Sequence, residues 1–114
     1  MSHFEKILAQ YSAHLEKERT LSAHTIRAYL GDLASFLESL TSQGVEDISV
    51  VTIANIRSWL ATQQVTGGAR TTLSRRAVSI RLFTKWAAKK GYLSKDVGAT
   101  LATPKGHRTL PDVL

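Results

Sequence analysis

The chain has 114 residues, of which 43% are hydrophobic and none is cysteine, so we expect one domain with its own core and neither disulfide bonds nor a cysteine-based zinc site. The net charge of +6 is divided unevenly, because residues 1–56 carry four Lys or Arg against seven Asp or Glu, whereas residues 57–114 carry eleven against two. No apolar run approaches the roughly 20 residues that span a bilayer, and no secretory leader pattern is present, so we expect a cytoplasmic protein without membrane contact.

The first half of the chain predicts two helices. Gly and Pro are few, seven and two, and apolar residues recur every three or four positions, which is typical of an all-α fold. Ser2 and Glu5 form a capping-box pattern for a first helix that we expect to run to about Arg19. Ser22 is a good N-cap for a second helix, and Gly44 supplies its C-terminal stop.

The second half predicts two further helices with a glycine pair between them. Thr52 is suited to cap the third helix, and Gly67-Gly68 interrupts the chain before a fourth helix over about residues 70–90. This fourth helix is apolar on two sides, so we expect it to pack against more than one neighbour. A short helix near residues 97–102 would complete a compact bundle of four main helices plus a short fifth. The second apolar stripe of the fourth helix consists of Val78, Leu82 and Trp86.

The start of the fourth helix combines basic and hydroxyl side chains, which suit the phosphate backbone of a nucleic acid. A face that only keeps a protein soluble usually has acidic residues among the basic ones, and none occurs here between Asp47 and Asp96. The sequence therefore predicts nucleic-acid contact by this helix. The candidate residues are Arg70, Thr71, Thr72, Arg75 and Arg76, followed further along the helix by Arg81 and Lys85.

The sequence shows no pattern of an enzyme site. Its four histidines include no H-x-x-x-H pair, and the common nucleotide-binding and nucleophile-elbow motifs are missing. Tyr11 and Tyr29 fall on apolar stripes, and Tyr92 follows a helix-ending glycine, so each is expected to be structural. We therefore expect no metal, no cofactor and no catalytic residue in this chain.

The last residues differ in composition from the rest. From Pro104 to Pro111 the chain is rich in Pro, Gly and basic residues but has no apolar period. We therefore expect a DNA-binding domain over residues 1–103 and the start of a linker to an absent domain over residues 104–114.

Two stretches carry a recognisable pattern. Residues 21–33 follow L-S-x-x-T-x-x-x-Y-x-x-D-L, and residues 74–87 contain R-R-A-x-S and F-x-x-W-A. Together with residues 104–111 they resemble the N-terminal core-binding domain of tyrosine recombinases of the XerC/XerD type, and XerC-like members most closely. Val78 stands where many members have Ser, which puts a hydroxyl contact there in doubt, and Asp96-Val97 replaces the usual Asn-Pro or Asp-Pro.

The resemblance implies a SAM-like bundle that clamps one face of double-stranded DNA. A separate C-terminal domain beyond Leu114 would carry the catalytic Arg, Lys, His and Tyr, so this chain alone would bind DNA without cutting it. The full-length protein would be a site-specific recombinase that resolves chromosome dimers during cell division, acting with XerD-like subunits in a tetramer on DNA. The resemblance also implies duplex contacts by His24, Thr25 and Arg27 near the start of the second helix, by Ser79 on the fourth, and by Lys105, His107 and Arg108 in the linker.

Other hypotheses stay open. The same domain occurs in phage and transposon integrases, which one sequence does not separate securely from chromosomal recombinases. From a different class, a helical interaction module could dock its basic helix onto an acidic protein. A helix-turn-helix regulator fits less well, since the connection over residues 64–70 contains two glycines and no suitable short helix pair is evident.

Overall fold

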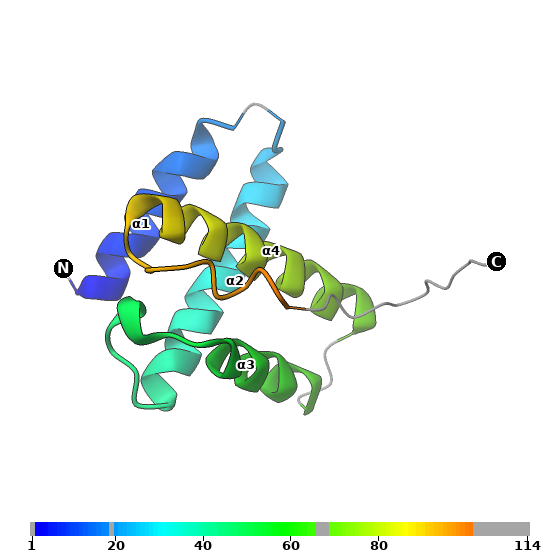
Figure 1. The fold of residues 1–114 in the computed structure, drawn as a ribbon. Helices are drawn as coiled ribbons and strands as arrows, with labels where there is room; N and C mark the ends of the chain where they lie inside the picture. The colour runs from blue at the N-terminus through cyan, green and yellow to red at the C-terminus, as the bar shows by residue number, and fades with distance from the viewer. Residues whose placement is uncertain (1, 19, 66–68, 102–114) are drawn as a thin grey trace.

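The computed structural model describes residues 2–18, 20–65 and 69–101, and these residues form helices joined by turns (Figure 1). In the described part of the chain no residue lies in a β-strand, which confirms the all-α class. The elements in chain order are α1 (His3–Glu16), α2 (Ala23–Ser42), the short 3-10 helix η1 (Ile48–Val50), α3 (Ile53–Val65) and α4 (Arg70–Lys90).

Local capping explains where the first two helices begin. The Glu5 backbone N–H donates to Ser2 Oγ at 3.1 Å while the Ser2 N–H donates to Glu5 Oε1 at 2.9 Å, so the capping box is confirmed. The N–H of Thr25 donates to Ser22 Oγ at 3.0 Å, which caps α2 as expected. α1 ends at Glu16 instead of near Arg19, because the next turn closes with i to i+3 hydrogen bonds.

α4 spans residues 70–90 as the sequence predicts, and Gly91 ends it with a φ of 85°, in the left-handed region that favours glycine. Its first apolar stripe is buried, including Ala77, Ile80 and Phe83. The second stripe was only partly correct: Trp86 is 6% exposed, but Val78 and Leu82 are 39% and 43% exposed. These two side chains lie on the exposed face of α4.

α2 packs against each of the other three α-helices. In Figure 1, α1 and α2 run side by side in opposite directions, α4 crosses α2 near its middle, and α3 lies along the lower side of α4. The core between them is aromatic: Tyr11 meets Phe83 edge-on with ring centroids 5.3 Å apart, and Phe36 meets Trp59 at 5.4 Å. The crossing of α2 and α4 is the part of the fold that positions the candidate site.

The expected fifth helix is wrong over residues 97–101, which form turns, and Ala102 lies outside the described residues. The chain after Gly91 returns along α4 (Figure 1) and buries Leu93 and, at the end of this segment, Leu101 in the core. Gly98 lies so close to Thr84 of α4 that a Cβ atom would collide with the Thr84 side chain. The segment is therefore packed closely against α4 at Gly98.

Candidate nucleic-acid interface

The outward face of α4 carries most of the basic residues that the sequence singled out. Arg70, Thr71, Arg81 and Lys85 are exposed along it, and Thr72 is half-buried in its first turn. No acidic residue occurs within α4. Ala69, at the N-cap position, makes no side-chain cap hydrogen bond, and the positive end of the helix dipole lies at this end of α4. This face therefore suits a polyanion.

Arg75 and Arg76 lie differently from the other basic residues, since both turn toward a carboxylate on α2. Arg75 donates from Nε to Asp32 Oδ2 at 3.0 Å and from Nη2 to Asp32 Oδ1 at 2.5 Å. Arg76 donates from Nε to Asp32 Oδ1 at 3.3 Å. One buried carboxylate, with its side chain 3% exposed, thus binds two guanidinium groups.

The two arginines differ in how far they reach into the molecule. The Arg76 side chain is 22% exposed, and its Nη1 donates to Oε1 of Gln63, so it ties α4 to α3 as well as to α2. The Arg75 side chain is 40% exposed and bonds only to Asp32 among the described residues. The hydrogen bonds to Asp32 raise the pKa of the Arg75 guanidinium above its usual value, so Arg75 stays charged.

This arrangement corrects one sequence expectation. The sequence predicted Arg75 and Arg76 only as nucleic-acid contacts, but α4 crosses α2 at Asp32, and a buried carboxylate requires cationic partners. The guanidinium groups are held at the helix crossing for that reason.

The start of α2 presents the second group of candidates. His24 and Arg27 are exposed, whereas Thr25 is half-buried and its hydroxyl accepts a hydrogen bond from Ser22 Oγ at 3.0 Å. The first turns of α2 and α4 occupy two arms of the helix crossing in Figure 1, above it and to its right. His24 and Arg27 thus flank the same crossing as the α4 residues, while Thr25 contributes to the helix cap.

Ser79 and the C-terminal candidates stand apart. Ser79 is 2% exposed on the inner side of α4, so its hydroxyl has no route to a bound duplex and we omit it from the candidate contacts. Lys105, His107 and Arg108 lie outside the described residues.

Sequence reasoning missed Asp32 and Gln63. Asp32 continues an apolar spacing formed with Tyr29, Leu33 and Phe36, and it is buried like Leu33 and Phe36. A lone acidic residue on a core stripe indicates a buried partner of opposite charge, and this signal could have identified Asp32. Gln63 carried no comparable signal.

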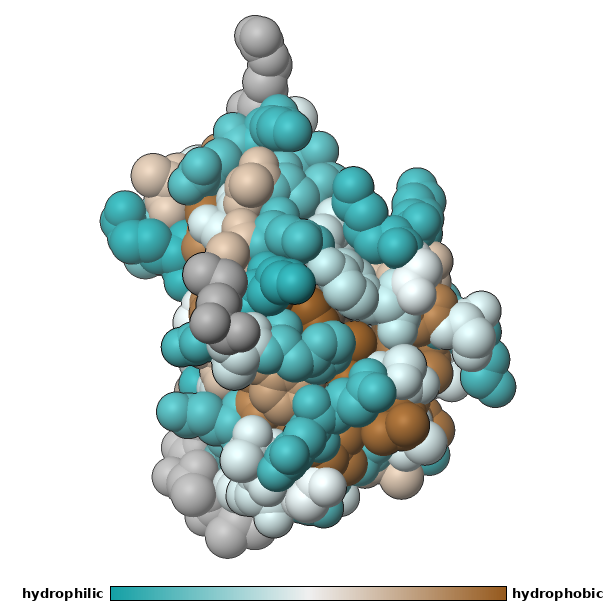
Figure 2. Space-filling view, turned by 90° about the vertical axis from the view of Figure 1, so that its left-hand side faces the viewer, coloured by the Kyte–Doolittle hydropathy of each residue, from teal (hydrophilic) through white to brown (hydrophobic). Residues whose placement is uncertain are grey.

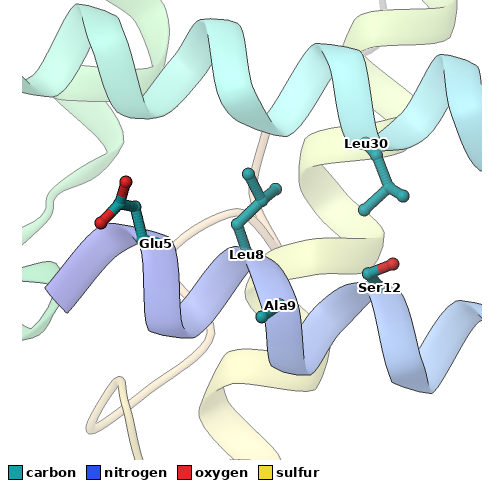
Figure 3. A pocket seen from close by; sticks show the side chains of 5 residues that line it. All are labelled: Glu5, Leu8, Ala9, Ser12 and Leu30. Atoms are coloured by element: carbon teal, nitrogen blue, oxygen red, sulfur yellow. The ribbon is translucent and has the colours of Figure 1, made fainter. Parts of the chain in front are cut away.

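Other parts of the surface have a different character. A hollow of 510 Å³ between α1 and α2 is lined by Glu5, Leu8, Ala9, Ser12 and Leu30, with Leu8 and Leu30 projecting into it (Figure 3). It carries no basic side chain. On the face seen in Figure 2, hydrophobic side chains emerge between hydrophilic ones. Among the described residues, no cluster of three or more acidic or histidine side chains could hold a metal, and no helix has the length and apolar character to cross a membrane.

Comparisons with known proteins agree with the pattern in the sequence. Residues 8–91 match the family described as phage integrase, N-terminal SAM-like domain. The chain is 43% identical over 110 residues to tyrosine recombinase XerC from Mycobacterium tuberculosis, covering 96% of this chain and 37% of that protein. It is 44% identical over 108 residues to tyrosine recombinase XerC from Mycobacterium leprae, covering 95% and 36%. The chain thus spans little more than a third of these relatives, and no solved structure gives a significant match.

Proposed function

Because the chain belongs to the family of phage integrase N-terminal SAM-like domains, we propose that it is the DNA-binding N-terminal domain of a XerC-type tyrosine recombinase. The observation that carries this proposal is the 43% identity to XerC proteins over 96% of the chain. The relatives are much longer than the matched stretch, and we assign the catalytic residues to a separate domain. This chain on its own then binds duplex DNA without cleaving it.

Charge and shape support duplex DNA as the ligand. An α-helix fits the major groove, and the exposed basic face of α4 neutralises phosphates on either side of it. His24 and Arg27 at the start of α2 lie beside the same helix crossing and extend the contact surface. We also assign Lys105, His107 and Arg108 to contacts with the DNA backbone. The α4 contacts proposed here are Arg70, Thr71, Thr72, Arg75, Arg81 and Lys85.

The finer biological role follows from the XerC relatives. We propose that the full-length protein acts in the cytoplasm, pairs with XerD-like subunits in a tetramer on two DNA sites, and resolves chromosome dimers during cell division. The names of the relatives support this role over that of a phage or transposon integrase.

A salt titration tests the proposal. Binding of the chain to a chromosome-dimer-resolution half-site duplex is measured beside a scrambled duplex of equal length, at salt concentrations from low to physiological. We expect tighter binding to the half-site with a steep salt dependence. Absence of binding to both duplexes would contradict the proposal and favour a module that docks onto an acidic protein.

A further inference from the structure

We propose that Asp32 is a positioning residue that holds the Arg75 guanidinium with its outer edge directed at the DNA, and that Arg75 binds a pair of acceptor atoms there. This inference rests on the proposed function, because it requires that α4 meets a duplex. The acceptor pair is either two phosphate oxygens or O6 and N7 of a guanine, since the outer edge of a guanidinium matches both.

The hydrogen bonds of Arg75 leave its outer edge available. Asp32 occupies the side edge of the guanidinium, formed by Nε and Nη2. A guanidinium has five N–H donors in one plane, so Nη1 and the second N–H of Nη2 point away from Asp32. Among the described residues Nη1 of Arg75 has no hydrogen-bond partner, and the side chain is 40% exposed. The remaining donors, on Nη1 and Nη2, form the outer edge of the guanidinium, which can donate to two acceptor atoms at once.

The Asp32 carboxylate is itself fixed. It is buried in the middle of α2. Its Oδ1 atom accepts from Arg75 Nη2 and also from Arg76 Nε. Arg76 is in turn held by Gln63 of α3. Three helices therefore determine where the carboxylate lies, and the carboxylate determines where the Arg75 guanidinium lies.

This geometry lowers the cost of binding. A free arginine loses several rotatable degrees of freedom when it grips a ligand, whereas Arg75 has lost them already during folding. The two arginines thus have different roles. Arg76, 22% exposed, holds the Asp32 carboxylate in place, and Arg75, 40% exposed, faces outward.

The substitution Arg75→Lys separates the effect of the positioned guanidinium on DNA binding from the effect of its positive charge. Arg75→Lys keeps the positive charge but loses the planar fork, so we expect about tenfold weaker binding to the half-site duplex at fixed salt, close to the loss in Arg75→Ala. Arg57→Lys is the matched control, because Arg57 is exposed on α3 and lies outside the proposed contacts, and we expect it to bind within about twofold of the wild type. Equal affinities of Arg75→Lys and wild type would overturn the inference.

Asp32→Asn supplies a second test in which charge and positioning predict opposite results. The substitution removes a negative charge, so electrostatics alone predicts tighter DNA binding with a steeper salt dependence. Positioning predicts weaker binding, because the amide no longer accepts from both arginines. Circular dichroism at the binding temperature checks the fold, and if this variant is unfolded the Arg75→Lys comparison decides.

The remaining outcomes are also distinguishable. If the wild-type chain binds neither duplex, the proposed function fails and this inference fails with it. If the wild type binds and either Arg75→Lys or a folded Asp32→Asn binds as tightly as the wild type or more tightly, the inference alone fails. A half-site with 7-deazaguanine identifies the acceptors: a loss of affinity seen in wild type but not in Arg75→Lys assigns guanine, and equal affinities of wild type for both half-sites assign phosphate oxygens.

Discussion

At the scale of single residues, the shared carboxylate at the helix crossing changes what the basic residues of α4 contribute. Asp32 neutralises one of the two charges on Arg75 and Arg76, so this part of α4 presents less positive charge than its sequence indicates. The same contacts join α2, α3 and α4. These arginines therefore act on stability as well as on binding.

We predict that Arg76→Ala destabilises the domain by about 2 kcal/mol, because it removes one of the two cations that bind the buried Asp32 carboxylate and also the hydrogen bond to Gln63. Arg75→Ala should cost only about 1 kcal/mol, since its more exposed ion pair is screened by solvent. Urea denaturation measures both values. Lys85→Ala serves as the exposed control on the same helix and should stay within about 0.5 kcal/mol of wild type. An Arg76→Ala variant as stable as this control would contradict a structural role for Arg76.

Tyr11 makes the free energy of unfolding of the domain depend on pH in the alkaline range. Burial, with a smaller contribution from Tyr29, raises the pKa of the Tyr11 hydroxyl above its usual value. Because the folded pKa exceeds the unfolded one, the stabilisation is complete below about pH 10 and is lost as pH rises above it. We expect the free energy of unfolding to fall less steeply between about pH 9 and 11 in Tyr11→Phe than in wild type. Parallel curves for the two proteins would refute this effect.

At the scale of elements, helix ends were predictable wherever a local contact sets them. Ser2 with Glu5, Ser22 and Gly91 act within four residues along the chain, so their residue types suffice. The segment over residues 97–101 was mistaken for a helix because its shape depends on a contact with Thr84, which is remote in sequence. Local pattern contains no information about such a contact.

Gly98 provides the test of that contact. Gly98→Ala should destabilise the domain by about 1 to 3 kcal/mol, because the added methyl group meets Thr84, which is 1% exposed and has no room to move. Gly31→Ala is the matched control: a Cβ at this exposed position of α2 meets nothing within 4 Å, so alanine should stabilise the helix by up to about 1 kcal/mol. Thermal denaturation of both variants measures the difference. Equal stability of the two variants would disprove the close packing of residues 97–101 on α4.

The positive charge of the candidate site was predictable from the sequence, but the positions of its side chains were not. Basic spacing along α4 correctly placed Arg81 and Lys85 on an exposed face. It did not reveal that Arg75 binds an acid 43 residues earlier, nor that Ser79 points into the core. Those facts depend on how α4 is rotated about its axis, and that rotation is fixed by packing against α2 and α3.

At the scale of the whole molecule, charge is separated between the first three helices and the fourth. Residues 1–56 are net acidic, while α4 contributes Arg and Lys with no acidic residue. Such a distribution orients the domain in the field of a polyanion before contact is made. α1, which carries Glu5 and Glu16, should then face away from the DNA, whereas the start of α2 with His24 and Arg27 stays on the DNA side.

The salt dependence of DNA binding tests this orientation. Each phosphate that a protein neutralises contributes about 0.9 to the slope of log K against log salt, so Arg81→Ala/Lys85→Ala should lower the slope by about 2 and weaken half-site and scrambled duplexes equally. Lys6→Ala removes an exposed cation from α1 and should leave the slope unchanged, because α1 belongs to the net acidic part of the chain. A slope that falls with Lys6→Ala but not with the double variant would place the DNA on α1. Both slopes are measured by fluorescence anisotropy on the same labelled duplex, so the sign of their difference decides which face of the domain meets the DNA.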